Sequence, residues 1–111
     1  MTNAYPVGYD LSVVQIHKTD IFVHWLDSLT DIRARARVLV RIERLAQGNP
    51  GDVKPVGEGV SELRIAYGPG YRVYFLQQGA DLIVLLAGGD KHSQAKDIRR
   101  ALRLAKEIKK I

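Results

Sequence analysis

The chain has 111 residues, a length that suits one domain with one hydrophobic core. It contains no cysteine, which excludes a disulfide framework and a thiolate metal site. The 17 Lys and Arg residues outnumber the 12 Asp and Glu residues, which gives a formal net charge of +5. This charge fits either a protein with solvated basic faces or one that binds a polyanion, which would be nucleic acid or an acidic protein segment.

The N-terminal part of the chain predicts a tail, a strand and a helix. Residues 1–10 are expected to form a tail, and they lack the basic start and apolar run of a signal peptide. Residues 11–18 are rich in β-branched side chains, which predicts a strand. Thr19 or Asp20 can cap the following helix. Its apolar face is predicted to consist of Phe22, Trp25, Leu26 and Leu29.

A second, arginine-rich helix is predicted to begin at Thr30 and Asp31 and to run to about Gln47. Gly48-Asn49-Pro50 supplies the stop signals. One side should carry the buried residues Ile32, Ala36, Leu39, Ile42 and Ala46. Another side carries Arg33, Arg37, Arg41 and Arg44, for which a solvated helical face is the favoured interpretation and a binding surface the alternative.

The second half of the chain predicts a hairpin, a buried strand and a last helix. Residues 51–59 are rich in Gly and Pro and are expected to form a loop, while residues 60–67 and 71–77 flank the strong turn signal Gly68-Pro69-Gly70. Residues 82–87 are apolar throughout, as expected of a strand covered on both faces, and Gly88-Gly89 should end it. The final helix should begin at Ser93 and bury Ile98, Leu102, Ala105 and Ile108.

These elements predict a single α+β domain spanning residues 1–111. A small antiparallel sheet, made of a three-stranded meander extended by the N-terminal strand, should pack against two N-terminal helices and one C-terminal helix. The longest apolar run, residues 82–89, is far shorter than a membrane span. We therefore expect a cytoplasmic protein with no membrane partner.

The predicted hairpin gathers two arginines and a tyrosine on one face of the sheet. Strand alternation and the expected turn place Arg64 opposite Tyr74, with Arg72 diagonally across from Arg64. Both guanidinium groups would then reach a common phosphate, and Tyr74 could stack on a base or donate its hydroxyl. The alternative is that each arginine pairs with a nearby carboxylate such as Glu62 and that Tyr74 simply packs.

A second polar group follows the buried strand, where Asp90-Lys91-His92 leads into the last helix. Free N–H groups at such a junction favour an anion. Lys91 could neutralise a phosphate, and His92 could act as acid or base. The alternative is a solvated lysine and a surface histidine. Gln94 and Asp97 follow on the helix, where the role of Asp97 could be no more than to complement the helix dipole.

These segments together resemble a known family of bacterial toxins. In order and spacing they are similar to the "addiction module killer" branch of the RelE/HigB/ParE toxin superfamily, and the similarity covers about residues 11–108. The segments are Phe22-x-x-Trp25-Leu26, the arginine-rich helix ending in Gly48-Asn49-Pro50-Gly51, Glu62-Leu63-Arg64-Ile65, residues 71–75 and 85–91, Gln94, Asp97-Ile98 and Ala101.

The resemblance implies a fold, an activity and a partner. Such toxins have a central antiparallel sheet flanked by helices. Most RelE- and HigB-like members cleave mRNA in the ribosomal A site, and they need no metal or other cofactor because the 2′-hydroxyl of the substrate attacks the adjacent phosphate. A cognate antitoxin, often with a helix-turn-helix, neutralises the toxin of this type II module. We therefore expect a metal-independent mRNA endoribonuclease that inhibits translation.

The resemblance also suggests roles for particular residues. Arg64 and Arg72 are expected to stabilise the charge on the phosphorane, assisted by Lys91, and His92 or Lys91 is the candidate acid or base. The residues expected to bind the substrate are Lys54, Tyr74, Asp90 and Gln94.

One feature departs from better-known members, which often carry a His-Tyr pair or a Tyr near the start of the last helix or at the C-terminus. Here the matching segment is Asp90-Lys91-His92-Ser93. Two alternatives therefore stay open. One is a ParE-like gyrase-binding toxin without nuclease activity, and the other is a catalytically degenerate antitoxin-binding partner.

Overall fold

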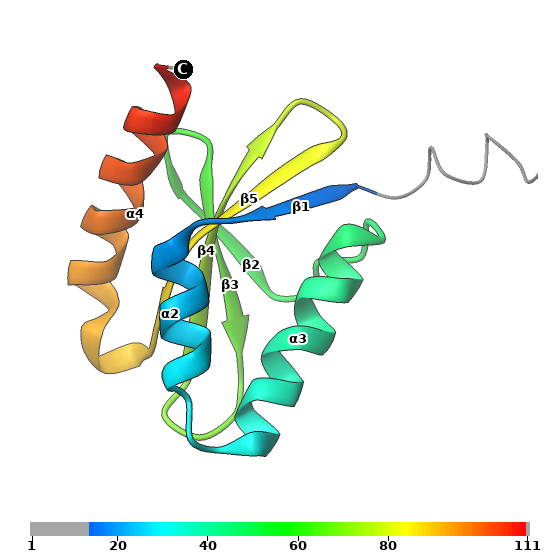
Figure 1. Cartoon of the computed structure of the whole chain (residues 1–111), viewed down its shortest axis with the longest axis vertical. Coiled ribbons are helices and arrows are strands. Elements are labelled where there is room, and N and C mark those ends of the chain that lie inside the picture. Colours follow the sequence, from blue (N-terminus) through cyan, green and yellow to red (C-terminus); the bar gives the residue numbers. More distant parts are fainter. Residues whose placement is uncertain (1–13, 111) are drawn as a thin grey trace, which may run out of the picture.

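A five-stranded mixed sheet with helices on both faces forms the centre of the structure (Figure 1). The computed structural model describes residues 14–110. The elements are β1 (Gln15–Lys18), α2 (Asp20–Ser28), α3 (Ile32–Ala46), β2 (Val53–Gly57), β3 (Val60–Ile65), β4 (Tyr71–Gln78), β5 (Leu82–Gly89), the 3-10 turn η1 (Lys91–Ser93) and α4 (Gln94–Lys109). The predicted α+β class is confirmed. The predicted tail, residues 1–10, and the start of the predicted first strand lie outside the described residues.

The strand order is β1-β5-β4-β3-β2, which differs in two ways from the predicted layout. First, β1 pairs in parallel with β5, so the expectation of a purely antiparallel sheet is wrong. Such a parallel neighbour needs a long connection, which the two helices and the following strands supply. Second, the segment predicted to be a loop contains the edge strand β2. An edge strand tolerates Pro55, and the ladder shifts register between Pro55 and Gly57.

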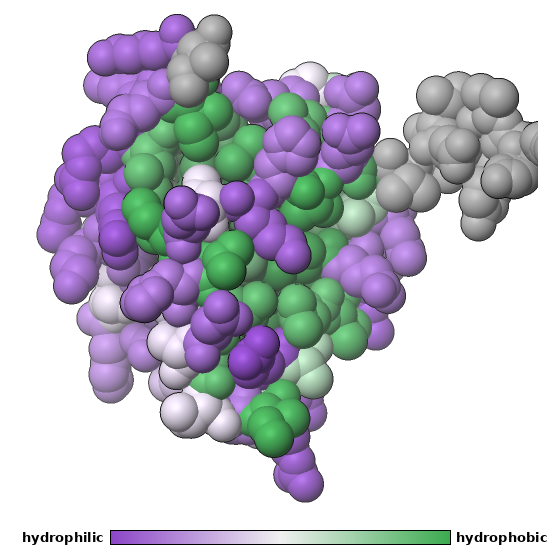
Figure 2. All heavy atoms as spheres, in the orientation of Figure 1, coloured by the Kyte–Doolittle hydropathy of each residue, from purple (hydrophilic) through white to green (hydrophobic). Residues whose placement is uncertain are grey.

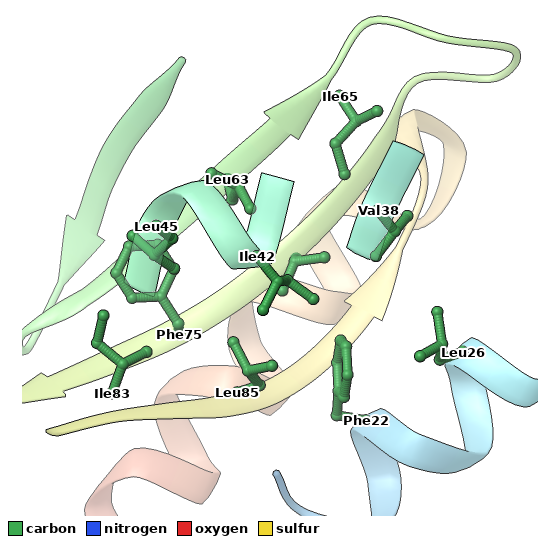
Figure 3. Packing of buried hydrophobic residues seen from close by; sticks show 11 residues of the cluster. Phe22, Leu26, Val38, Ile42, Leu45, Leu63, Ile65, Phe75, Ile83 and Leu85 are labelled. Atoms are coloured by element: carbon green, nitrogen blue, oxygen red, sulfur yellow. The ribbon is translucent and has the colours of Figure 1, made fainter. Parts of the chain in front are cut away.

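Two apolar clusters cover the two faces of the sheet. Side chains of α2 and α3 pack with β3, β4 and β5 on one face, as Figure 3 shows around Phe22, Ile42 and Phe75. Helix α4 packs on the other face against Val60, Leu76 and other side chains of the same strands. The prediction that β5 is covered on both faces is therefore confirmed. No helix within residues 14–110 is long and apolar enough to cross a membrane.

The first two helices begin at side-chain caps. The Thr19 hydroxyl accepts a hydrogen bond from the N–H of Phe22 at 3.0 Å, which confirms Thr19 as one of the two predicted caps. Asp31 accepts from the N–H groups of Arg33 and Ala34 at the start of α3.

Helix α3 is rotated from the predicted orientation. Its buried residues are Ala34, Val38, Ile42 and Leu45. Three members of the predicted stripe are instead exposed, namely Ala36, Ile32 (81 % accessible to solvent) and Leu39 (44 %). In this orientation the Arg41 guanidinium donates to the carbonyl of Pro50 at 3.0 Å and also to those of Asp52 and Arg64. Arg41 therefore fastens α3 to the start of β2 and to the end of β3.

The β3–β4 hairpin has a register two residues away from the predicted one. Arg64 lies directly opposite Arg72, and Glu62 lies opposite Tyr74. The connection is longer than predicted, because β3 ends at Ile65 and β4 begins at Tyr71. Within it, Gly68 and Gly70 adopt positive φ angles of 54° and 82°, which Gly tolerates without steric cost.

The two glycines predicted to end β5 are part of the strand, and both are contact points. A Cβ atom on Gly88 would lie 2.1 Å from the ring of Trp25, and one on Gly89 would lie 1.9 Å from a carboxylate oxygen of Asp97. The glycines therefore let a helix side chain approach each face of this strand end. The Gly-Gly pair at 88–89 therefore reflects close packing of helix side chains on β5 and does not end the strand.

This packing predicts that Gly88→Ala destabilises the fold by about 1–3 kcal/mol, because the added methyl overlaps the Trp25 ring. The measurement is the urea midpoint of unfolding. In a Trp25→Ala background the same substitution should cost much less, since the clashing ring is gone. Equal costs in both backgrounds would contradict the contact.

Candidate functional site

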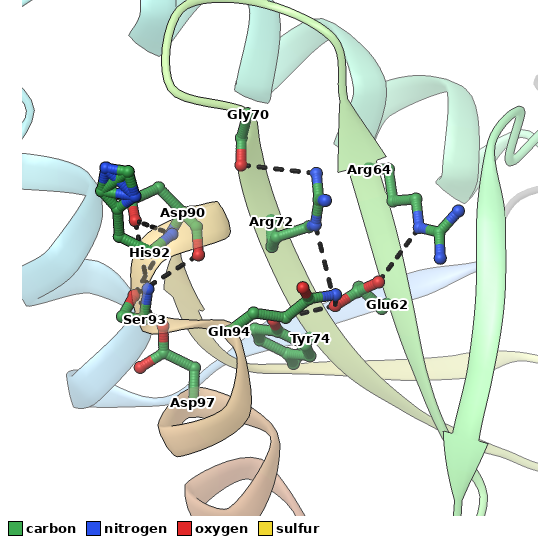
Figure 4. A network of polar contacts seen from close by, with 10 residues as sticks. All are labelled: Glu62, Arg64, Gly70, Arg72, Tyr74, Asp90, His92, Ser93, Gln94 and Asp97. Carbon is green, nitrogen blue, oxygen red and sulfur yellow. Dashed lines mark hydrogen bonds and ion pairs between the residues drawn. The ribbon is translucent and has the colours of Figure 1, made fainter.

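A row of polar side chains lies on the face of the sheet that α4 covers. Cross-strand partners share one face, so the pairs Glu62–Tyr74 and Arg64–Arg72 place all four side chains together. Gln94, the first residue of α4, joins them, and its side-chain amide donates to Glu62 at 2.8 Å. The site therefore lies where two neighbouring strands meet the start of a helix (Figure 4).

The carboxylate of Glu62 is the centre of this group, and its side chain is fully buried. It accepts hydrogen bonds from Arg64 Nε at 3.1 Å and from the Tyr74 hydroxyl at 3.0 Å, besides the one from Gln94. Arg72 Nε lies 3.7 Å from the carboxylate, within ion-pair range. The alternative stated for the sequence, in which both arginines pair with Glu62, is therefore present in the structure.

These contacts set the protonation states of the buried pair. Burial would raise the pKa of Glu62, but hydrogen bonds from Gln94, Arg64 and Tyr74 and the charge of Arg72 outweigh it, so its pKa is lowered. Burial, followed by the hydrogen bond to Glu62, raises the pKa of Tyr74. At neutral pH the carboxyl is therefore ionised and the phenol is protonated.

Two residues predicted to bind substrate are engaged inside the protein instead. Tyr74 has no exposed face, so the expectation that it stacks on a base does not fit its burial. Its hydroxyl does donate a hydrogen bond, as expected, but to Glu62. Gln94 also points at Glu62, so both side chains support the site from within.

The two arginines keep donors available for an anion. Each approaches Glu62 through Nε, and Arg72 also donates from one terminal nitrogen to the carbonyl of Gly70 at 3.4 Å. Among the residues that the structure describes, the terminal nitrogens of Arg64 have no hydrogen-bond partner. Two cations and one carboxylate leave a net positive charge, which suits a phosphate group.

The predicted lysines lie beside this pair. A Cβ atom on Gly70 would lie 3.6 Å from Lys91 Cβ and 3.5 Å from a terminal nitrogen of Arg72, so Lys91 and Arg72 are neighbours across Gly70. Lys54 is exposed on β2 and lies opposite Glu62 in the ladder. These two residues extend the positive surface on either side of the arginines.

The turn after β5 is built on Asp90 and Asp97. One oxygen of Asp90 accepts from the N–H groups of His92 at 2.8 Å and Ser93 at 3.3 Å, so this carboxylate caps the turn. Ser93 in turn donates to the Asp97 carboxylate, which is 5 % exposed and packs on Gly89. Asp97 thus holds the turn, a role that the helix-dipole interpretation missed although Gly89 and Ser93 signal it.

His92 is the predicted site residue that the structure does not bring to the arginines. Its side chain is exposed, and in Figure 4 the ring lies on the opposite side of Asp90 from Arg72. Residues 14–110 hold no group of three His, Asp or Glu side chains arranged so that they could bind a metal ion.

Comparisons with known proteins agree with this architecture. The family described as "Phage derived protein Gp49-like (DUF891)" matches residues 24–110 of the chain. The chain belongs to the Gp49-like family. This family is of the RelE/HigB kind and is associated with toxin–antitoxin modules. An uncharacterized protein of Haemophilus influenzae is 50 % identical over 95 residues, covering 86 % of this chain and 96 % of the relative.

The Gp49-like match begins within α2 and reaches the end of α4, so it includes the whole of the candidate site. Membership of a toxin–antitoxin family implies an antitoxin partner. The relative's name assigns no reaction, so the chemistry has to be argued from the residues of this Gp49-like protein.

The lowered pKa of Glu62 predicts a stability contribution that depends on pH. Because the folded pKa is below the ordinary value of 4.5, the contribution is fully present above that value and is lost as pH falls through the lowered one. We expect the melting temperature of the wild type to fall more steeply than that of Glu62→Gln between about pH 6 and pH 3. Asp27→Asn, which removes an exposed ion pair with Arg35, is the control and should follow the wild type. Parallel curves for the wild type and Glu62→Gln would contradict the lowered pKa.

Proposed function

We propose that this Gp49-like protein is the toxin of a type II module and acts as a metal-independent endoribonuclease on mRNA bound to the ribosome. The observation that carries the proposal is the facing pair Arg64 and Arg72, with Lys91 beside it. A protein that only bound other proteins would have no need to hold cations together at this cost, because like charges directly opposite in a sheet repel.

The proposed reaction is an attack by a 2′-hydroxyl of the RNA on the adjacent phosphate. The new O–P bond closes a 2′,3′-cyclic phosphate, the P–O5′ bond breaks, and the proton lost by the 2′-hydroxyl is matched by one delivered to the 5′-oxygen. Terminal N–H groups of Arg64 and Arg72 would donate to the non-bridging oxygens, where negative charge develops. Charge stabilisation of this kind usually supplies the largest share of such catalysis.

The remaining site residues take supporting roles in this proposal. The proton transfers are assigned to Lys91, which lies beside Arg72, and to His92, whose exposed ring would have to turn from its position in the structure to reach the phosphate. Lys54, exposed on β2, would contact a neighbouring phosphate. Gln94 and Asp90 support the site through their internal hydrogen bonds, one to Glu62 and the other across the turn.

The partners in this proposal are mRNA, the ribosome and a cognate antitoxin of the helix-turn-helix type, and the location is the cytoplasm, where translation occurs. For the antitoxin, a groove runs between α3 and the end of β3. Its lining includes four arginines and the aliphatic residues Ala36, Val40, Ile65 and Ala66. On the face of the molecule seen in Figure 2, hydrophobic side chains also reach the surface in several places among polar ones.

The lining of this groove suits an acidic amphipathic segment of the antitoxin. Val40 is 45 % exposed, so the groove offers apolar contact area as well as positive charge. Aliphatic area favours the side chains of a peptide, whereas a sugar–phosphate backbone gains nothing from it. Arg33 and Arg44 are exposed and available for carboxylates of such a segment.

The test of the nuclease is induction of the chain in a bacterial host, with growth, protein synthesis and primer extension on a reporter mRNA as readouts. We expect growth arrest and new cuts in the message, both lost in Arg64→Ala/Arg72→Ala, because removing a charge-stabilising donor lowers such rates by about 100-fold or more. Arg35→Ala, on the exposed side of α3, is the control and should remain toxic.

Other outcomes would support the alternatives. Arrest with intact mRNA would favour a ParE-like gyrase-binding toxin, and gyrase assays would then be the next step. Absence of arrest, with a folded chain that binds its antitoxin, would favour a degenerate partner. Circular dichroism of the double variant is needed, because Glu62 loses both of its cationic neighbours in it.

The groove predicts that Arg33→Glu/Arg44→Glu weakens antitoxin binding by about tenfold or more, because both charges reverse in an apolar setting. The measurement is calorimetric titration of the purified chain with its antitoxin. Arg99→Glu/Arg103→Glu makes the same change of charge on the exposed face of α4 and should bind like the wild type. Equal weakening by both variants would mean that overall charge, and not the groove, determines binding.

A further inference from the structure

We propose that Glu62 is a positioning residue, a buried carboxylate that holds the guanidinium groups of Arg64 and Arg72 so that their free ends face one phosphate. The proposal rests on the proposed nuclease function. It gives a role in the reaction to Glu62, for which the sequence suggested only an ion pair with the arginines. Glu62 is distinct from a catalytic base, because its side chain has no exposed surface through which RNA could reach it.

The need for such a residue follows from the register of the hairpin. Arg64 and Arg72 lie directly opposite each other, where two like charges on long, flexible side chains would turn apart. Glu62 lies two residues before Arg64 on the same face of β3 and diagonally across from Arg72. One negative charge beside the two cations reduces their repulsion and restricts both side chains.

The way in which the arginines contact Glu62 leaves them competent to bind an anion. Both use Nε, at 3.1 Å for Arg64 and 3.7 Å for Arg72. An arginine held through both terminal nitrogens would have spent its planar fork on the protein. Here the carboxylate lies beside the Nε of each guanidinium, and both terminal nitrogens of Arg64 and one of Arg72 remain for the ligand.

Glu62 can orient the arginines because it is itself fixed. Tyr74 on β4 and Gln94 at the start of α4 both donate to it, at 3.0 and 2.8 Å. Its neighbours on this face, such as Val60, are buried and apolar. Apolar side chains in place of the whole buried group would avoid the cost of burying its charges, which often leaves a fold no less stable. A positioning role accounts for a carboxylate, rather than an apolar side chain, at this point of the sheet.

Kinetics of Glu62→Gln separate positioning from simple electrostatics. The substitution keeps the shape of the side chain and makes the site more positive, so electrostatics alone predicts tighter RNA binding and undiminished cleavage. Positioning predicts that kcat falls by about tenfold or more while KM does not rise, because the phosphate still binds but the donors are misplaced. Glu62→Asp, which retains the charge on a shorter chain, should lie between the two.

A second readout is independent of nuclease activity. In the 15N-labelled wild type we expect the Nε–H protons of both arginines to exchange slowly with water, that of Arg64 because it is hydrogen-bonded to Glu62 and that of Arg72 because it is buried beside the carboxylate. In Glu62→Gln they should exchange about tenfold faster, like those of exposed arginines. Tyr74→Phe keeps the charge and loses one donor to Glu62, so it should show the same change to a smaller extent. Asp27→Asn is the control and should change neither resonance.

The outcomes distinguish the two proposals. If the wild type cleaves no RNA, the nuclease function fails, and the exchange rates alone decide whether Glu62 holds the arginines. If Glu62→Gln keeps slow exchange and full kcat, the positioning role is wrong. If Glu62→Gln does not fold, Tyr74→Phe and Glu62→Asp carry the test, and wild-type kcat and exchange in both would overturn the proposal.

Discussion

The ionised carboxylate of Glu62 is buried between the sheet and the first turn of α4, and the arrangement of the site depends on it. Burying such a charge is costly unless hydrogen bonds and opposite charges surround it. β3, β4 and α4 each supply a partner, so these three elements are tied together at one point. The same contacts hold two arginines against the face of the sheet, where each alone would be a mobile surface side chain.

The sheet separates two surfaces of different character. The polar site lies on the face covered by α4, whereas the groove lined by arginines lies on the side of α3. Arg41 contacts both regions, because it lines the groove and donates to the backbone carbonyl of Arg64. A partner bound in the groove would therefore contact Arg41, which is hydrogen-bonded to the strand that carries Arg64, without covering the anion-binding side chains.

Local signals in the sequence were sufficient for most elements, β2 excepted, but insufficient for how the elements meet. Helix caps such as Thr19 and the apolar run of β5 depend on neighbouring residues, and both are as predicted. The hairpin register depended on the length of one connection, and a turn signal at 68–70 does not determine where pairing resumes. That error moved Arg64 from opposite Tyr74 to opposite Arg72.

The roles of individual site residues were harder to predict for the same reason. Strand alternation places Glu62 beside Arg64, but only the packing of α4 shows that the carboxylate is buried and that Tyr74 and Gln94 are directed at it. The glycines 88 and 89 resembled a strand break because their contacts, with Trp25 and Asp97, come from distant parts of the chain. Burial and long-range contact are the quantities that a single sequence leaves open.

In the proposed reaction, the site divides into two parts that are held by separate networks. Charge stabilisation belongs to Arg64 and Arg72, which are held on the sheet through Glu62. Proton transfer belongs to Lys91 and His92, on a turn that is held by Asp90, Ser93 and Asp97. No carboxylate is shared between the two networks, but Gln94 directly follows Ser93 in the chain and donates to Glu62, so a loosened turn would disturb both parts. All members of the family share the fold, but whether a member cleaves RNA would then depend on these two small networks remaining intact together.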